Sequence, residues 1–137
     1  MNEEWEKLYL AARSVIRPYE VSQNICVGGV GAAVLTANGN IYTGICIDTS
    51  CSLGMCAERN ALSTMFTNGE YEVLKVCAVY QDGTVMPPCG ACREFMMQLD
   101  RNSGDIEILM DYETRQTARL KTLMPAWWGS DRMENAH

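Results

Sequence analysis

The chain has 137 residues, of which 47% are hydrophobic and 20% charged, as in an ordinary globular protein with a sizeable core. No apolar run is long enough to span a bilayer, and the acidic start MNEEWEKLYL does not look like a secretory signal, so we expect a cytoplasmic protein. The net charge of −6 argues against binding of long nucleic acids, because such binding needs a basic protein surface, and it favours a small-molecule ligand.

The hydrophobic pattern predicts helices and strands in alternation. Apolar residues recur on one face over residues 3–17, which predicts an amphipathic helix that ends at Pro18. Apolar, β-prone runs over 30–35 and 41–47 flank Asn38-Gly39, a strong hairpin signal. The other expected elements are helices over 56–67, 90–99 and 117–123 and strands over 74–80 and 106–110. With no linker or repeat, residues 1–137 are expected to form one α/β domain in which helices cover a mixed sheet.

Seven cysteines are many for this length, and without an export signal metal binding for some and burial for the rest is the expected use. The pair Cys89-x-x-Cys92 alone fits a zinc site, a redox motif or chance. Cys56-Ala57-Glu58 stands upstream, with 29 residues between it and Pro88-Cys89. The combination is similar to the signature of zinc-dependent deaminases.

Three thiolates, from Cys56, Cys89 and Cys92, would leave one tetrahedral position of Zn²⁺ open for water, as catalytic zinc requires. Glu58 is then placed to take a proton from that water and deliver it to a substrate. A structural zinc site would need a fourth protein ligand and would leave Glu58 unexplained. The cysteines available for it are Cys26, Cys46, Cys51 and Cys77.

Three thiolates on one Zn²⁺ give a net charge of about −1, which weakens the ion's effect on a bound water unless positive charge compensates. Both cysteine motifs open predicted helices, whose N-termini stabilise thiolates. Arg59 and Arg93 directly follow Glu58 and Cys92, and each is either a hydrogen-bond donor to the ligand sulfurs or a solvated surface arginine. His137, the only histidine, stands in a polar end and is not expected to be a ligand.

Over roughly residues 5–128, and most clearly in VGAAVLTANGNIYTG, CAERNAL and PCGACREF, the sequence resembles the cytidine deaminase family. The resemblance is to its small homotetrameric three-cysteine branch, which includes blasticidin-S deaminase. It implies a three-layer α/β/α sandwich with a mixed five-stranded sheet, and active sites completed by neighbouring subunits. It also implies that Cys56, Cys89 and Cys92 bind zinc and that Glu58 is the proton shuttle.

The segments expected to contact substrate depart from the family pattern. Gly28-Gly29 stands where Phe-Pro is usual, and Cys46-Ile47-Asp48 stands where Asn-Val-Glu holds the sugar. Cys46, Asp48 and Ala57 are nevertheless the positions that the resemblance places at the substrate. Near the end of the chain Trp127 and Trp128 match an aromatic residue that caps the base, although packing in a core or an interface is an equal alternative.

The expected reaction is hydrolytic deamination at C4 of the cytosine ring in a free nucleoside, a step of pyrimidine salvage, with the uracil analogue and ammonia as products. One alternative is a cytosine nucleoside antibiotic of the blasticidin S type. Another is a modified or N4-substituted cytosine nucleoside, and a third is a non-catalytic zinc protein. Editing of polynucleotides ranks below these because the chain is acidic.

Overall fold

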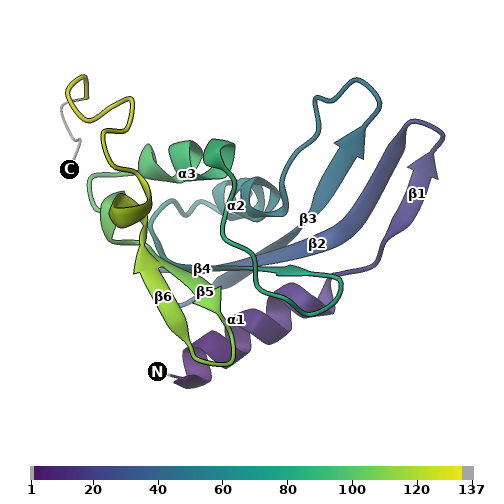
Figure 1. Cartoon of the computed structure of the whole chain (residues 1–137), viewed down its shortest axis with the longest axis horizontal. Helices are drawn as coiled ribbons and strands as arrows, with labels where there is room; N and C mark the ends of the chain where they lie inside the picture. Colours follow the sequence, from purple (N-terminus) through teal and green to yellow (C-terminus); the bar gives the residue numbers. More distant parts are fainter. Residues whose placement is uncertain (1, 134–137) are drawn as a thin grey trace.

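A computed structural model describes residues 2–133, which form three layers. Helix α1 (Asn2–Ser14) covers one face of a sheet, and α2 (Ala57–Thr67) and α3 (Gly90–Met97) cover the other (Figure 1). This arrangement confirms the expected α/β/α sandwich. Within the described residues, none of the helices is both long enough and apolar enough to cross a membrane.

The sheet has six strands among the described residues, one more than expected, and its pairing is mixed. The strands are β1 (Tyr19–Ser22), β2 (Ile25–Thr36), β3 (Ile41–Thr49), β4 (Val73–Tyr80), β5 (Glu107–Asp111) and β6 (Gln116–Arg119). The long β2 pairs antiparallel with β1, β3 and β4, whereas β4 and β5 run parallel and β6 returns antiparallel to β5. Short 3-10 helices, η1 (Ser103–Asp105) and η2 (Leu120–Leu123), flank the last two strands.

Side-chain alternation along β4 divides the interior into two cores. Val76 and Ala78 point to the face covered by α2 and α3, and Cys77 and Val79 point to the face covered by α1. This is the period of two that a strand buried on both faces produces. The amphipathic α1 completes the second core with Trp5 and its apolar neighbours.

The segment over 117–123 is not the helix that its pattern predicts. Thr117 and Ala118 pair with Leu109 and Ile108 of β5, and η2 begins only at Leu120, which is fully buried. Pairing with a strand edge outweighs the local helical preference of so short a segment. Strand β1 was also not foreseen, because its four residues are all exposed and carry no alternating pattern.

Close packing of α2 on β3 fixes where the helix begins. A Cβ added at Gly44 of β3 would lie 2.3 Å from the backbone nitrogen of Ala61, so only glycine allows this approach. The amide of Asn60 donates a hydrogen bond of 3.0 Å to the carbonyl of Ile45. The first turn of α2, which carries the Cys-Ala-Glu motif, is thereby held against the sheet.

Candidate metal centre

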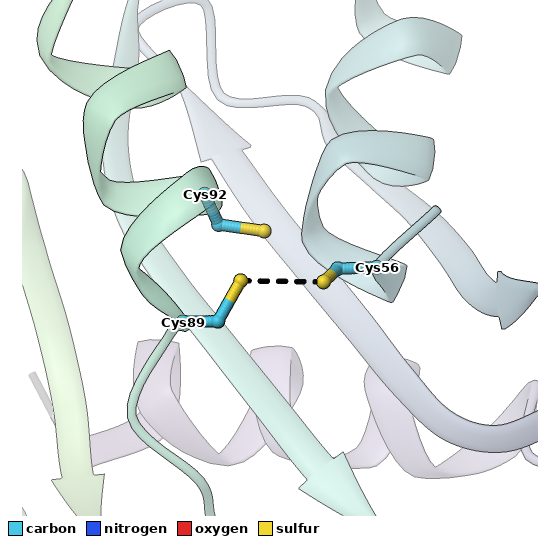
Figure 2. Close-up of side chains that lie close together, drawn as sticks. All are labelled: Cys56, Cys89 and Cys92. Carbon is cyan, nitrogen blue, oxygen red and sulfur yellow. Dashed lines mark hydrogen bonds between the residues drawn. The ribbon is translucent and has the colours of Figure 1, made fainter. Parts of the chain in front are cut away.

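Three cysteines converge where two helices begin. Cys56 is the residue before α2, Cys89 is the residue before α3, and Cys92 lies in the first turn of α3. Their sulfurs all lie within 4.8 Å of one another, and the Sγ atoms of Cys56 and Cys89 are 3.3 Å apart. Figure 2 shows the three side chains pointing into the space between the two helix starts.

The geometry of this cluster fits zinc. Zinc–sulfur bonds are about 2.3 Å, so thiolates that share one tetrahedral ion lie about 4 Å apart. Among the described residues, which include all seven cysteines, the cluster contains Cys56, Cys89 and Cys92 and no fourth cysteine. Three soft donors with no fourth protein thiolate match a catalytic zinc site rather than a closed structural one.

The backbone at the start of α3 lowers the pKa of one of the three thiols, Cys89, whereas the pKa of Cys56 and that of Cys92 are raised. Burial raises the pKa of the Cys89 thiol, but the backbone N–H groups of Cys92 and Ala91 and the thiols of Cys56 and Cys92 outweigh burial, so that the pKa is lowered overall. Burial raises the pKa of Cys56, and Arg59 opposes this shift. The start of α3 therefore favours a thiolate at Cys89 before any metal is considered.

The two arginines beside the motifs have different partners. The guanidinium of Arg59 donates a hydrogen bond to Cys56 Sγ at 3.7 Å, and its support of a zinc ligand stays a prediction. Arg93 instead donates from Nε to the carbonyl of Pro88 at 2.8 Å and from Nη1 to the carbonyl of Leu123 at 3.2 Å. Two of its donors therefore go to backbone carbonyls, and a hydrogen bond from Arg93 to a ligand sulfur stays a prediction.

Glu58 lies in the first turn of α2 and is only 5% exposed. Its Oε1 is 3.9 Å from Cys92 Sγ, which brings the carboxylate beside the sulfur cluster without making it part of the ligand set. Burial raises the pKa of this carboxyl, and its own backbone N–H and the charge of Arg59 act in the opposite direction. A buried carboxylate beside a metal site is a typical general acid–base group.

A cavity of about 160 Å³ joins these groups. It is lined by Cys56, Ala57, Glu58 and Cys89, and by further residues that include Cys46 and are largely apolar. Larger hollows of about 500 and 470 Å³ lie elsewhere on the surface, and neither is lined by a cysteine. Of these three hollows of the described residues, the small cavity is the one lined by both candidate metal ligands and a candidate proton-transfer group.

Two of the predicted substrate positions, Cys46 and Ala57, line this cavity. The Cys46 sulfur accepts the backbone N–H of Val30 at 3.3 Å, at a bulge in the β2–β3 pairing. Asp48 is exposed, pairs with Cys26 in that ladder, and does not line the cavity. Sequence reasoning missed Met86 and Pro87, which form part of the wall, although the prolines just before Cys89 were a signal for a fixed turn there.

Neither of the two tryptophans near the end of the chain lines this cavity. Trp127 is buried in the core that α2 and α3 cover, and its indole N–H has no hydrogen-bond partner within residues 2–133. Trp128 is 55% exposed, and its ring lies 5.7 Å from the guanidinium carbon of Arg132. Capping of a base by either ring stays a prediction, and His137 lies outside the described residues.

Residues 5–103 match the family model for the cytidine and deoxycytidylate deaminase zinc-binding region. This chain belongs to that family. It is 33% identical over 103 residues to a cytidine deaminase of Mycobacterium tuberculosis, and the aligned region covers 74% of each chain. It is 34% identical over 107 residues to a probable cytidine deaminase of Dictyostelium discoideum, covering 74% of this chain and 69% of that one.

Solved structures agree with this family assignment. A crystal structure of cytidine deaminase from Mycobacterium tuberculosis has a TM-score of 0.76 to this chain at 26% identity, and the match covers 92% of this chain and 98% of the other. The match to the family's zinc-binding region and the three-cysteine cluster together make this family member a zinc-dependent hydrolytic deaminase.

Proposed function

We propose that this enzyme deaminates free cytidine and 2′-deoxycytidine to the uracil nucleosides and ammonia, with Cys56, Cys89 and Cys92 holding the zinc and Glu58 moving the proton. The observation that carries the proposal is the shared cavity, because Glu58 and two cysteines of the sulfur cluster, Cys56 and Cys89, line the same small space. The curated relatives, which carry the name cytidine deaminase, support this choice of substrate.

The chemistry follows from these groups. Zinc, when bound, supplies a Lewis acid that lowers the pKa of a water molecule to near neutrality. Glu58 accepts the proton that this water loses and delivers it to N3 of the ring, as a C–O bond forms at C4. Glu58 then takes the proton of the new C4 hydroxyl and passes it to the amino group, the C4–N bond breaks as the C4 carbonyl forms, and ammonia leaves. Water is consumed and no oxidant or further cofactor is needed.

The size of the cavity indicates which part of the substrate it takes. Pockets for whole drug-sized ligands span roughly 300–1,000 Å³, whereas this one is about 160 Å³. A pyrimidine ring suits that space and its apolar walls, and the sugar then lies at the rim. We propose that a neighbouring subunit of a homotetramer completes the rim, in keeping with the resemblance described above.

Cys46 favours a second candidate substrate, a cytosine nucleoside antibiotic of the blasticidin S type. Its sulfur is engaged by the N–H of Val30, so this wall offers a sugar hydroxyl only a weak donor. A substrate with an altered sugar loses little at such a wall. Rates of ammonia release from cytidine and from blasticidin S, measured side by side on one preparation, decide between the two.

The test of the proton shuttle is Glu58→Gln, which keeps the shape of the side chain and removes the base. We expect zinc to be retained and the rate of ammonia release from cytidine to fall about 100- to 10,000-fold. Glu113→Gln, at an exposed turn far along the chain, is the matched control and should keep the wild-type rate. A Glu58→Gln enzyme with a nearly normal rate would remove Glu58 from the mechanism.

A further inference from the structure

Cys89 stands at the end of a stretch with few backbone hydrogen bonds of its own. Met86 donates its N–H to the carbonyl of Ala78 at 2.9 Å, but Pro87 and Pro88 have no N–H to donate. The same stretch forms one wall of the cavity through Met86 and Pro87. The carbonyl of Cys89 accepts the backbone N–H of Arg93 at 3.0 Å, and the carbonyl of Pro88 is the next group through which the position of this proposed zinc ligand can be fixed.

Arg93 holds it. Its side chain returns from the first turn of α3, and Nε donates to the carbonyl of the buried Pro88 at 2.8 Å. Its Nη1 donates to the carbonyl of Leu123 at 3.2 Å. Leu123 ends η2, which Leu120 anchors in the core with no exposed surface. One rigid, planar guanidinium thus links the residue before Cys89 to a fixed point of the fold.

We infer that Arg93 is a positioning residue for the metal centre, acting on Cys89 through the Pro88 carbonyl and not through a sulfur. Lysine cannot replace it, because a single ammonium on a flexible stem does not present the planar fork that spans both carbonyls. The inference rests on the proposed function only in taking Cys89 as a zinc ligand, and it does not depend on which nucleoside is the substrate.

Zinc release from the zinc-loaded full chain to a coloured chelator, 4-(2-pyridylazo)resorcinol, tests the inference. Partners of metal ligands typically contribute about 10- to 100-fold in metal affinity, so Arg93→Gln should release zinc about 10- to 100-fold faster than wild type. Arg93→Lys should behave like the glutamine variant. The control is Arg119→Gln, which removes an exposed arginine 3.4 Å from Asp105 and should release zinc at the wild-type rate.

Alkylation of the same zinc-loaded chains by iodoacetamide, followed at each cysteine by mass spectrometry, separates positioning from general loosening. In Arg93→Gln we expect faster alkylation of Cys89, while Cys77, which is 1% exposed, stays protected. Wild-type zinc release in Arg93→Gln or in Arg93→Lys overturns the inference, and so does alkylation of Cys77 that rises in step with Cys89. Failure of the proposed function is a separate result, namely no ammonia from any cytosine nucleoside with wild-type enzyme.

Discussion

Replacement of Gly44 by alanine should damage the active site from a position that touches no substrate. The added Cβ would lie 2.3 Å from the backbone nitrogen of Ala61 and 2.8 Å from the carbonyl oxygen of Ala57. Ordinary van der Waals contact begins near 3.4 Å, and both neighbours are backbone atoms, so the start of α2 has to retreat by about 1 Å. That turn carries Cys56 and Glu58.

The expected magnitudes follow from this retreat. Overpacking typically costs about 1–3 kcal/mol, which exceeds the gain of up to about 1 kcal/mol that alanine brings by restricting the unfolded chain. Each kcal/mol lowers the Tm by about 4 °C for a domain of this size. A displacement of about 1 Å at reacting groups costs about 100-fold in rate, so kcat/KM for cytidine should fall by that order.

Thermal unfolding followed by circular dichroism and ammonia release from cytidine measure the two effects of Gly44→Ala. The control is Gly29→Ala, where an added Cβ meets nothing within 4 Å, so the Tm should not fall and can rise by up to about 4 °C. A Gly44→Ala enzyme with the wild-type Tm and kcat/KM would refute the claim that contact between α2 and β3 sets the position of the site.

Further predictions concern single side chains. Hydrogen bonds from Thr36, Tyr42 and nearby asparagines lower the pKa of Glu70 to about 2, so its stabilising effect is complete above pH 4.5 and lost as the pH falls towards 2. The Tm difference between wild type and Glu70→Gln should therefore be largest near neutral pH and vanish near pH 2, and a pH-independent difference would contradict this origin. Arg59→Gln removes the donor to Cys56 and should weaken zinc binding about 10- to 100-fold in chelator competition, whereas unchanged affinity would show that this contact is dispensable. The indole N–H of Trp127 has no hydrogen-bond partner among the described residues, so Trp127→Phe breaks no such bond, and urea unfolding should show a loss well below the ~3–5 kcal/mol typical of truncating a buried tryptophan to alanine. A loss in that full range would contradict the prediction.

Local sequence patterns were enough to predict the hairpin of β2 and β3 and the meeting of the two cysteine motifs. The Asn38-Gly39 turn does join paired strands, with Leu35 opposite Ile41, because two residues with turn chemistry fix the register of what flanks them. The convergence of Cys56, Cys89 and Cys92 was equally predictable, since zinc requires particular donor atoms and the spacing of the two motifs matches that requirement. Cys56 and Cys89 meet although 32 residues separate them, because the helices that they precede share one face of the sheet.

What the sequence could not reveal depends on contacts between distant segments. The hydrogen-bond partners of Arg93 are backbone carbonyls, which every residue carries, so the sequence does not indicate which carbonyls they are. The hydrogen bond from Val30 to Cys46 follows from a bulge whose position only the folded ladder defines. Strand β6 likewise forms because the edge of β5 is available, which the residues of 116–119 do not indicate by themselves.

The most direct test of the account is to let the zinc-loaded enzyme convert cytidine in water enriched in ¹⁸O and to measure the mass of the product by mass spectrometry. If the buried Glu58 activates water for attack at C4, each uridine formed should carry one ¹⁸O on the ring, and one ammonia should be released with it. Failure to form uridine, or uridine formed without the label, would contradict hydrolytic deamination in this cavity.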